Sequence, residues 1–411
     1  MKIAEAKWAE IHVALLFAVL LGLSSSCSTN TSDAQSNVRS NNPSTPIEVF
    51  EDFKREDNAV LKENHGKDDD MDLTKVESIQ ELNDQSTLSH QLEGKGIGAI
   101  GIDIGDFSFD ALIAGPSSGE PIMLLHGFPN TNYQWREQIV ALAEAGFSVI
   151  APNQRGYSSG ARPTGIESYT SEKLVEDVRQ IADALHWESF HLAGHDWGAF
   201  IAWEFAGKYP DRLRTLIPIS VPHPEAFAIA LADPNGIQAE MSSYVEFFQQ
   251  AESTSTFLAD NASLLKSIYE SAGLSAEEME PYLQILGKPE ALDAALNWYR
   301  ANNFSPPLDQ ATNRRSRTPD IETPTMYIWS TEDTALGRQG AELTSRFVSG
   351  EYRYEVFEGV NHWITEIAAK QLNAVMLDFL NEKVERVDKA KNSEKLQSRW
   401  TRKCKSGSIR S

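Results

Sequence analysis

The 411-residue chain has almost no cysteine, no metal-binding motif and no excess of positive charge. Its two cysteines, Cys27 and Cys404, exclude a disulfide framework and a cysteine-based zinc site. None of its nine histidines stands in an HExxH or HxH pattern, so a catalytic metal has no sequence support. A net charge of −22 argues against a nucleic-acid partner held by phosphate contacts. We therefore expect neither a metal nor another cofactor.

The chain also lacks a long hydrophobic run. Its apolar N-terminal segment, Val13–Leu23, has eleven residues and is too short to span a bilayer comfortably. Lysines precede this segment, and serines and Cys27 follow it, which resembles a bacterial lipoprotein signal whose cysteine is lipidated. We predict an export signal over residues 1–27 and a place in the cell envelope, on the periplasmic or outer-membrane side, with membrane contact only through Cys27. A plain cleaved signal and a mis-called start codon, which would leave the protein in the cytoplasm, are the alternatives.

Both ends beyond the signal are polar. Residues 28–95 hold 15 acidic and 7 basic side chains, a net charge of −8, which is too polar a composition to offset chain entropy. We predict a disordered acidic tether there. Residues 383–411 carry 10 basic and 3 acidic side chains, a net charge of +7, which indicates a solvated basic tail over 386–411.

Short apolar runs alternate with amphipathic stretches between these ends. Seven runs are predicted as strands: 107–114, 121–125, 148–151, 190–193, 215–220, 325–329 and 352–357. Helices are predicted at 134–145, 171–186, 197–209 and 366–382. This alternation predicts an α/β core over 96–224 and 316–385, with a mostly parallel sheet flanked by helices. The interval 225–315 breaks the rhythm and has helical composition, so we predict an inserted helical cap above the strand ends, where such sheets bind ligands.

The segment Gly96–Gly101 matches the G-x-G-x-x-G pattern of dinucleotide-binding proteins. That pattern requires a strand before it and a helix after it. Here the acidic segment precedes it and strand-like sequence follows, so we expect no nicotinamide or flavin cofactor.

The segment Gly194–Gly198 lies between a predicted strand and a predicted helix, the context of a nucleophile elbow. Its central residue is Asp196 in place of the usual serine. A carboxylate is already an anion and is suited to displacement at an sp3 carbon, which forms an alkyl ester on the enzyme. Water activated by a histidine then hydrolyses this ester, so a serine esterase or lipase is disfavoured.

The partners of the nucleophile should follow in the order acid, then histidine. Asp333 follows the strand 325–329 and is the predicted acid, with Glu332 as the competing residue. His362 follows the strand 352–357 and is the predicted general base. We assign the oxyanion hole to the backbone amides of Trp197 and Phe128.

These residues together resemble the epoxide hydrolases of the α/β-hydrolase superfamily. The resemblance covers about residues 104–382 and is carried by His126–Pro129, Gln154–Tyr157, Gly194–Gly198, Ser220–Pro224, Asn297–Arg300 and Gly359–Trp363. It implies the α/β-hydrolase fold with an eight-stranded sheet, a cis peptide before Pro129 and a structural role for His126. Asn153 departs from the family pattern, in which aspartate is usual.

The resemblance further implies two cap tyrosines that assist opening of the epoxide. Tyr299 and Tyr244 match their positions, with Tyr269 and Tyr282 as alternatives. The cap aromatics Trp298, Phe247 and Phe248 suggest an apolar substrate, although core packing explains them equally well. We expect a small apolar epoxide, converted with water to a 1,2-diol. A haloalkane dehalogenase with the same triad is the runner-up, although Phe128 stands where that family often has asparagine. A hydrolase fold retained as a non-catalytic binding module is a further alternative. The choice of epoxide and the oligomeric state stay open.

Overall fold

The computed structural model describes residues 92, 94–302 and 318–384. The chain divides into two compact units, Met1–Gly96 and Ile97–Ser411, and the fold lies in the second. Several predictions fall outside the described residues: the signal 1–27 with Cys27, nearly all of the tether 28–95, the cap residues 303–315 and the tail 386–411. Within the described residues, no helix combines the length and the apolar character needed to cross a bilayer.

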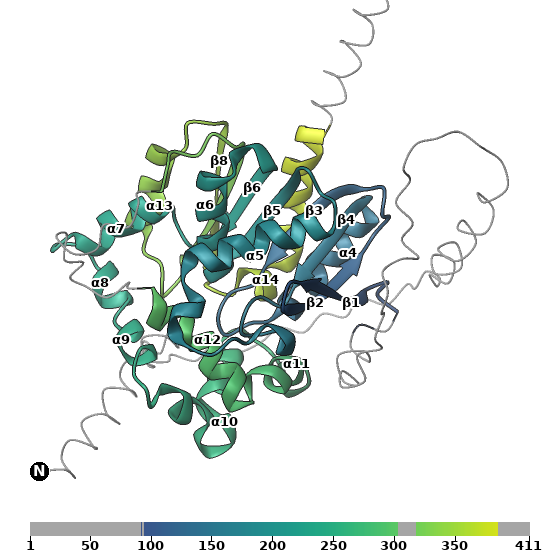
Figure 1. Ribbon diagram of the computed structural model, residues 1–411. Helices are drawn as coiled ribbons and strands as arrows, with labels where there is room; N and C mark the ends of the chain where they lie inside the picture. Colours follow the sequence, from purple (N-terminus) through teal and green to yellow (C-terminus); the bar gives the residue numbers. More distant parts are fainter. Residues whose placement is uncertain (1–91, 93, 303–317, 385–411) are drawn as a thin grey trace, which may run out of the picture. The chain divides into compact units, whose positions relative to one another are not determined.

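An eight-stranded sheet forms the centre of the second unit (Figure 1), in the order β1-β2-β4-β3-β5-β6-β7-β8. The pairs β1–β2 and β2–β4 are antiparallel, and all other neighbours are parallel. The strands are β1 (Gly98–Ile104), β2 (Phe107–Ala114), β3 (Glu120–Leu125), β4 (Phe147–Pro152), β5 (Phe190–His195), β6 (Leu213–Ile219), β7 (Thr325–Glu332) and β8 (Tyr352–Asn361). The predicted α/β fold class and mostly parallel eight-stranded sheet are confirmed.

Strand β1 is the one strand that the hydrophobic pattern did not single out. It contains Gly98 and Gly101 of the G-x-G-x-x-G segment and pairs with β2 from the edge of the sheet. A turn with positive φ at Gly105 joins the two strands. The segment is therefore an edge strand and lacks the strand-to-helix geometry of a dinucleotide site.

Helices cover both faces of the sheet (Figure 1). On one face, α5 (Ser171–Ala184) packs against α6 (Trp197–Lys208), which also contacts β5 and β6. On the other face, α4 (Arg136–Glu144) contacts β4 and is hydrogen-bonded to a helix over residues 369–384. Helix α5 buries an apolar stripe at helical spacing: Leu174, Val175, Val178, Ile181 and Ala182.

Two predicted helices differ from the observed ones at their starts. The predicted helix 134–145 begins as a 3-10 turn, η2 (Asn132–Trp135), and becomes α-helical at Arg136. The predicted helix 366–382 is divided into α14 (Ile364–Ile367) and the helix 369–384, because Ala368 departs from helical backbone angles. The division places α14 directly after the strand β8 and the loop that carries His362.

The described part of the interval 225–302 is helical. Helix α7 (Pro224–Ala232) packs beside α13 (Arg338–Leu343) of the core. The remaining helices lie together at one end of the strands (Figure 1) and are called the cap: α8 (Gln238–Met241), α9 (Tyr244–Phe248), α10 (Ser253–Ser271), α11 (Ala276–Leu286) and α12 (Pro289–Ala301). Non-helical backbone at Ala259–Ala262 interrupts α10.

Candidate active site

Asp196 occupies the sharp turn between β5 and α6, with φ 52° and ψ −122°. Such angles are strained for a residue with a side chain and are typical of functional turns. Glycines surround the turn because nothing larger fits. A Cβ on Gly194 would lie 2.2 Å from the Gly198 carbonyl oxygen, and a Cβ on Gly127 would lie 2.4 Å from the Asp196 Cβ. The local sequence thus builds the predicted elbow and places a buried Asp196 at the turn between β5 and α6.

The carboxylate of Asp196 lies between an amide and an imidazole. The Phe128 N–H donates to its Oδ1 at 2.9 Å, and the Trp197 amide also donates to the carboxylate. His362 Nε2 lies 3.6 Å from Oδ2. Burial raises the pKa of Asp196, while His362 and the two amides act in the opposite direction and favour the anion. The amides of both predicted oxyanion-hole residues therefore contact the predicted nucleophile. The peptide between Phe128 and Pro129 is cis, as expected.

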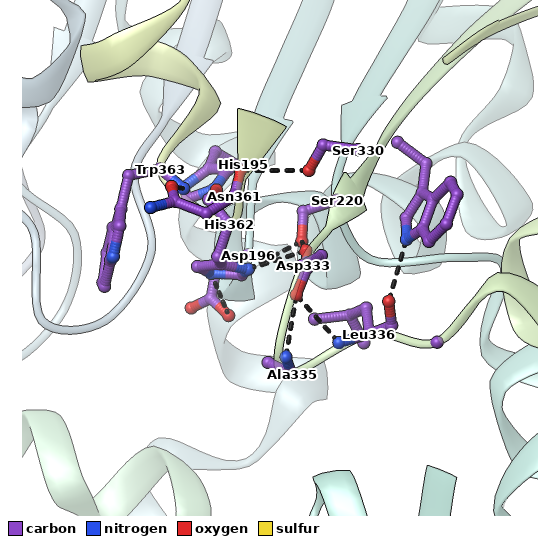
Figure 2. Close-up of polar contacts among 12 residues, drawn as sticks. His195, Asp196, Ser220, Ser330, Asp333, Ala335, Leu336, Asn361, His362 and Trp363 are labelled. Carbon is purple, nitrogen blue, oxygen red and sulfur yellow. Dashed lines mark hydrogen bonds and ion pairs between the residues drawn. The ribbon is translucent and has the colours of Figure 1, made fainter. Parts of the chain in front are cut away.

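His362 bridges two carboxylates (Figure 2). Its Nδ1 is 2.9 Å from Asp333 Oδ2, while its Nε2 faces Asp196. Burial alone lowers the pKa of His362, but the charges of Asp333 and Asp196 outweigh it and raise the pKa. The competing residue Glu332 is exposed at the end of β7, whereas Asp333 is buried against the imidazole.

Asp333 is held by four hydrogen bonds. Its Oδ1 accepts from the amides of Ala335 and Leu336 at 2.8 and 2.9 Å. Its Oδ2 accepts from the Ser220 hydroxyl at 2.7 Å and from His362. Burial raises the pKa of Asp333, but His362 and these donors lower it overall, so the group stays anionic. An anionic Asp333 orients the imidazole and stabilises its protonated form.

Two residues beside His362 were named in motifs but assigned no role from the sequence. Ser220 follows β6 with φ 72°, and its hydroxyl lies 3.0 Å from His362 Nδ1. His195 Nε2 donates to the His362 carbonyl at 2.9 Å, and the two rings lie 4.8 Å apart (Figure 2). Burial lowers the pKa of His195 to about 3, so this imidazole is neutral. The residue that follows β6 lies beside Asp333 because β6 and β7 are neighbours in the sheet, and the segment around Ser220 does not itself indicate this adjacency.

The two predicted cap tyrosines both pack against Phe248 of the cap. The ring centroids of Tyr299 in α12 and Tyr244 in α9 lie 5.0 and 5.1 Å from that of Phe248. The Tyr299 ring also lies 5.1 Å from the ring of Trp197 and 5.5 Å from that of Phe128, the two residues whose amides contact Asp196. Burial and the charge of Asp196 raise the pKa of both phenols. Both therefore keep their protons at neutral pH and can donate them or hydrogen-bond with them.

The two alternative tyrosines have hydroxyl partners outside this group. Tyr269 donates to the Pro129 carbonyl at 2.7 Å, and Tyr282 donates to the Glu366 carboxylate. The charge of Asp196 therefore acts on Tyr244 and Tyr299, whereas the hydroxyls of Tyr269 and Tyr282 are hydrogen-bonded elsewhere.

Aromatic rings pack together beside Phe128. Phe248 and Phe257 lie 5.3 and 5.9 Å from the Phe128 ring, and Phe247 lies 5.7 Å from Phe257. Phe257 was not among the predicted residues. The predicted substrate contact Trp298 is buried, donates to the Arg155 carbonyl at 3.0 Å and packs edge-on against Trp197 at 5.5 Å. Trp298 thus joins the cap to the core loop 153–157.

Two polar residues below the site support loops. His126 Nε2 accepts from the Gln154 amide at 3.1 Å, and burial lowers the pKa of His126 to about 4. Asn153 Oδ1 accepts from the Asn132 amide at 2.9 Å. In the described residues, no three His, Cys, Asp or Glu side chains group as metal ligands would.

The sequence profile of the alpha/beta hydrolase fold family matches residues 120–369. This chain belongs to the α/β-hydrolase fold family. It is 34% identical to the AB hydrolase superfamily protein YfhM of Bacillus subtilis over 277 residues, 65% of this chain and 92% of that protein. It is 32% identical to Epoxide hydrolase 4 of Mus musculus, over 67% of this chain and 77% of that protein.

A solved structure gives the same relationship. This α/β-hydrolase matches the crystal structure of Bacillus megaterium epoxide hydrolase in complex with an inhibitor with a TM-score of 0.63 at 29% identity. The match covers 68% of this chain and 99% of that one. The family and these relatives establish that the chain is a hydrolase.

Proposed function

We propose that this hydrolase converts a small apolar epoxide to a 1,2-diol through an aspartyl ester. One observation carries the proposal. A carboxylate, Asp196, stands at the elbow between an amide and the imidazole of His362, and its charge acts on the protonated phenols of two cap tyrosines. The similarity to Epoxide hydrolase 4 and to the Bacillus megaterium enzyme supports the same reaction.

In the first half-reaction, a carboxylate oxygen of Asp196 attacks one ring carbon of the epoxide. The carbon–oxygen bond of the ring breaks, and an alkyl ester forms on Asp196. The departing oxygen takes up the electron pair of the broken bond and receives hydrogen bonds and a proton from Tyr244 and Tyr299. General-acid assistance of this kind contributes about 10²- to 10⁴-fold.

In the second half-reaction, His362 Nε2 removes a proton from water, and the resulting hydroxide attacks the ester carbonyl carbon. The carbonyl oxygen becomes an oxyanion, which the amides of Phe128 and Trp197 stabilise. Its collapse breaks the ester bond, and the proton of the added hydroxyl passes to the departing alkoxide, which releases the diol and restores the carboxylate of Asp196. Asp333 stabilises the imidazolium, whose proton returns to the phenolate left by the first half-reaction.

The substrate class follows from the side chains around Asp196. The rings of Phe128, Phe248 and Phe257 pack together beside the phenols, and all three are buried. An apolar group on the epoxide gains from burial against such rings, by about 25 cal/mol per Å² of apolar area. An anionic substituent would find no cationic partner among these three side chains.

The test follows two products with the purified full-length protein. Diol formation from an aryl epoxide and halide release from a bromoalkane are measured in parallel, with Asp196→Ala as the control. Diol without halide, lost in the variant, supports the proposal. Halide without diol would assign the chain to the haloalkane dehalogenases. A biological activity that survives in Asp196→Ala would mean a non-catalytic binding role.

We further propose that the chain is exported and lipid-anchored at Cys27. The apolar run Val13–Leu23 followed by serines and a cysteine supports this placement. Cell fractionation tests it: the protein should be recovered with membranes, and Cys27→Ala should release it. Recovery of the unmodified full-length chain in the cytoplasm would rule out export.

A further inference from the structure

The last turn of the cap helix α10 is hydrogen-bonded to the loop that carries the proposed oxyanion hole. The Tyr269 hydroxyl donates to the Pro129 carbonyl at 2.7 Å, and Tyr269 is fully buried. Pro129 follows Phe128 directly, and the Phe128 amide contacts Asp196 at 2.9 Å. The Phe128 amide belongs to the peptide Gly127–Phe128 and the Pro129 carbonyl to the peptide Pro129–Asn130. The bond from Tyr269 therefore restrains the loop two peptide units from the amide that faces the reacting carboxylate.

The same turn of α10 also contacts both chain neighbours of His362. The Ser271 carbonyl accepts from Asn361 Nδ2, and the Ser271 hydroxyl accepts from the Trp363 indole, each at 3.1 Å. The hydroxyl of Ser271 donates in turn to the Ile268 carbonyl at 2.6 Å, which fixes its orientation within the helix. The base is thus held between two residues that are both bonded to the cap.

A neighbouring ion pair extends this contact into the core. Tyr282 of α11 stacks on Tyr269 with ring centroids 5.0 Å apart and donates to Glu366 of α14. Glu366 pairs with Arg136 of α4 at 2.7 Å, and the Glu366 side chain is 3% exposed. Buried, fully paired groups of this kind have little freedom to reorient, so the end of α10 is held rigidly.

We propose that Tyr269 and Ser271, called the α10 clamp, are positioning residues for ester hydrolysis. They hold the Phe128 amide and the His362 imidazole in the geometry that the second half-reaction needs. The inference rests on the proposed function. Neither clamp residue is placed at the reacting atoms, yet a misplacement of about 1 Å in a catalytic group can cost about 10²-fold in rate.

The clamp should act on hydrolysis more than on alkylation. Hydrolysis requires the Phe128 amide at the oxyanion and His362 at the attacking water. Alkylation depends on Asp196 and the phenols Tyr244 and Tyr299, which the clamp residues do not bond. The carboxylate of Asp196 also keeps the Trp197 amide when Phe128 shifts.

Single-turnover mass spectrometry separates the two steps. Excess full-length protein is mixed with an aryl epoxide and quenched with acid at intervals, and the mass of the alkylated chain is followed. Its rise gives the alkylation rate constant and its decay gives the hydrolysis rate constant. Both are independent of the fraction of active protein, so a mere loss of folded enzyme does not move them.

Tyr269→Phe and Ser271→Ala are each expected to lower the hydrolysis rate constant by about fivefold to tenfold. The alkylation rate constant should stay within about twofold. Tyr169→Phe is the matched control, because the Tyr169 hydroxyl also donates to a proline carbonyl at 2.7 Å, that of Pro163. It should change neither constant.

An unchanged hydrolysis constant, or an equal fall in both constants, would overturn the clamp. Ser271→Ala deletes one hydroxyl and decides the matter if Tyr269→Phe does not fold. If the wild-type protein never gains the mass of the substrate, the proposed function itself is refuted. Normal alkylation with wild-type hydrolysis in both variants would refute the clamp alone.

Discussion

The Ser220 hydroxyl donates a 2.7 Å hydrogen bond to the same oxygen of Asp333 that contacts His362 Nδ1. Ser220 is itself fixed, because the Tyr327 hydroxyl donates to its carbonyl at 2.8 Å. His362, Asp333 and Ser220 therefore form one closed polar group (Figure 2), and all three residues are buried. This arrangement predicts how the turnover number depends on pH.

The turnover number should fall as the pH decreases through a value above 6.5, the ordinary pKa of histidine. The sign follows from the direction of the His362 shift: its pKa is raised, and only the neutral imidazole can take a proton from water. Ser220→Ala removes a donor that competes with His362 for Asp333, so the acid limb of the kcat profile should move further up. Asp333→Asn removes the charge and should move the limb down, with a loss of about 10²- to 10⁴-fold in kcat. A limb that stays in place in both variants would refute this assignment.

The phenols of Tyr244 and Tyr299 should act together in alkylation. Each single change to phenylalanine leaves one donor for the departing oxygen, so kcat/KM should fall by about 10- to 100-fold. The double change should cost at least about 10³-fold, because the alkoxide then forms without a proton donor. Steady-state diol formation measures the effect. Tyr209→Phe, which loses a 3.2 Å bond to Glu176, is the control and should retain full activity.

The variant His362→Gln should trap the ester. Asp196 and the phenols are intact, so alkylation proceeds, but no base activates the water. Intact-mass analysis should show the chain plus one epoxide mass, persisting after the free substrate is removed. Adding Asp196→Ala to this variant should abolish the adduct. An adduct that survives in the double variant would place the nucleophile elsewhere.

Local sequence was sufficient for the elbow and for most of the sheet. Gly194 and Gly198 bracket a residue at a strand-to-helix turn, and this arrangement needs no distant contact to be recognised. The choice between Asp333 and Glu332 depended on the end of the strand β7. Glu332 is the last residue of the strand, whereas Asp333 follows it and contacts His362. Strand β1 was missed because its glycines and its mostly exposed edge position give no hydrophobic alternation.

The roles of Ser220, His195 and Phe257 depend on tertiary neighbours. Ser220 lies beside Asp333 only because β6 and β7 are adjacent in the sheet, and strand order is not a local property. Phe257 lies in α10 of the cap and contacts Phe128 of the core, 129 positions earlier in the chain, so the contact depends on how the cap packs on the core. Tyr269 was likewise predicted only as an alternative cap tyrosine, because its hydrogen bond to the Pro129 carbonyl joins residues far apart in the sequence.

The ion pair of Arg155 and Asp177 should dominate the stability of the loop below the site. Arg155 donates to both carboxylate oxygens of Asp177, at 2.7 and 2.5 Å, and both side chains are buried. Burial raises the pKa of Asp177 more than Arg155 lowers it, so the buried charges are costly when unpaired. Asp177→Asn should lower the free energy of unfolding by about 3–5 kcal/mol.

Chemical denaturation measures this loss of stability, and an ion pair on the protein surface serves as the control. Arg179 pairs with Asp183, whose side chain is 44% exposed, so Asp183→Asn should cost at most about 1 kcal/mol. Trp298 of the cap donates to the Arg155 carbonyl, so a displaced Arg155 should also loosen the cap. Diol formation in folded Asp177→Asn should therefore fall, whereas Asp183→Asn should keep it. Equal losses in the two variants would show that the buried pair contributes no more to the free energy of unfolding than the exposed pair does.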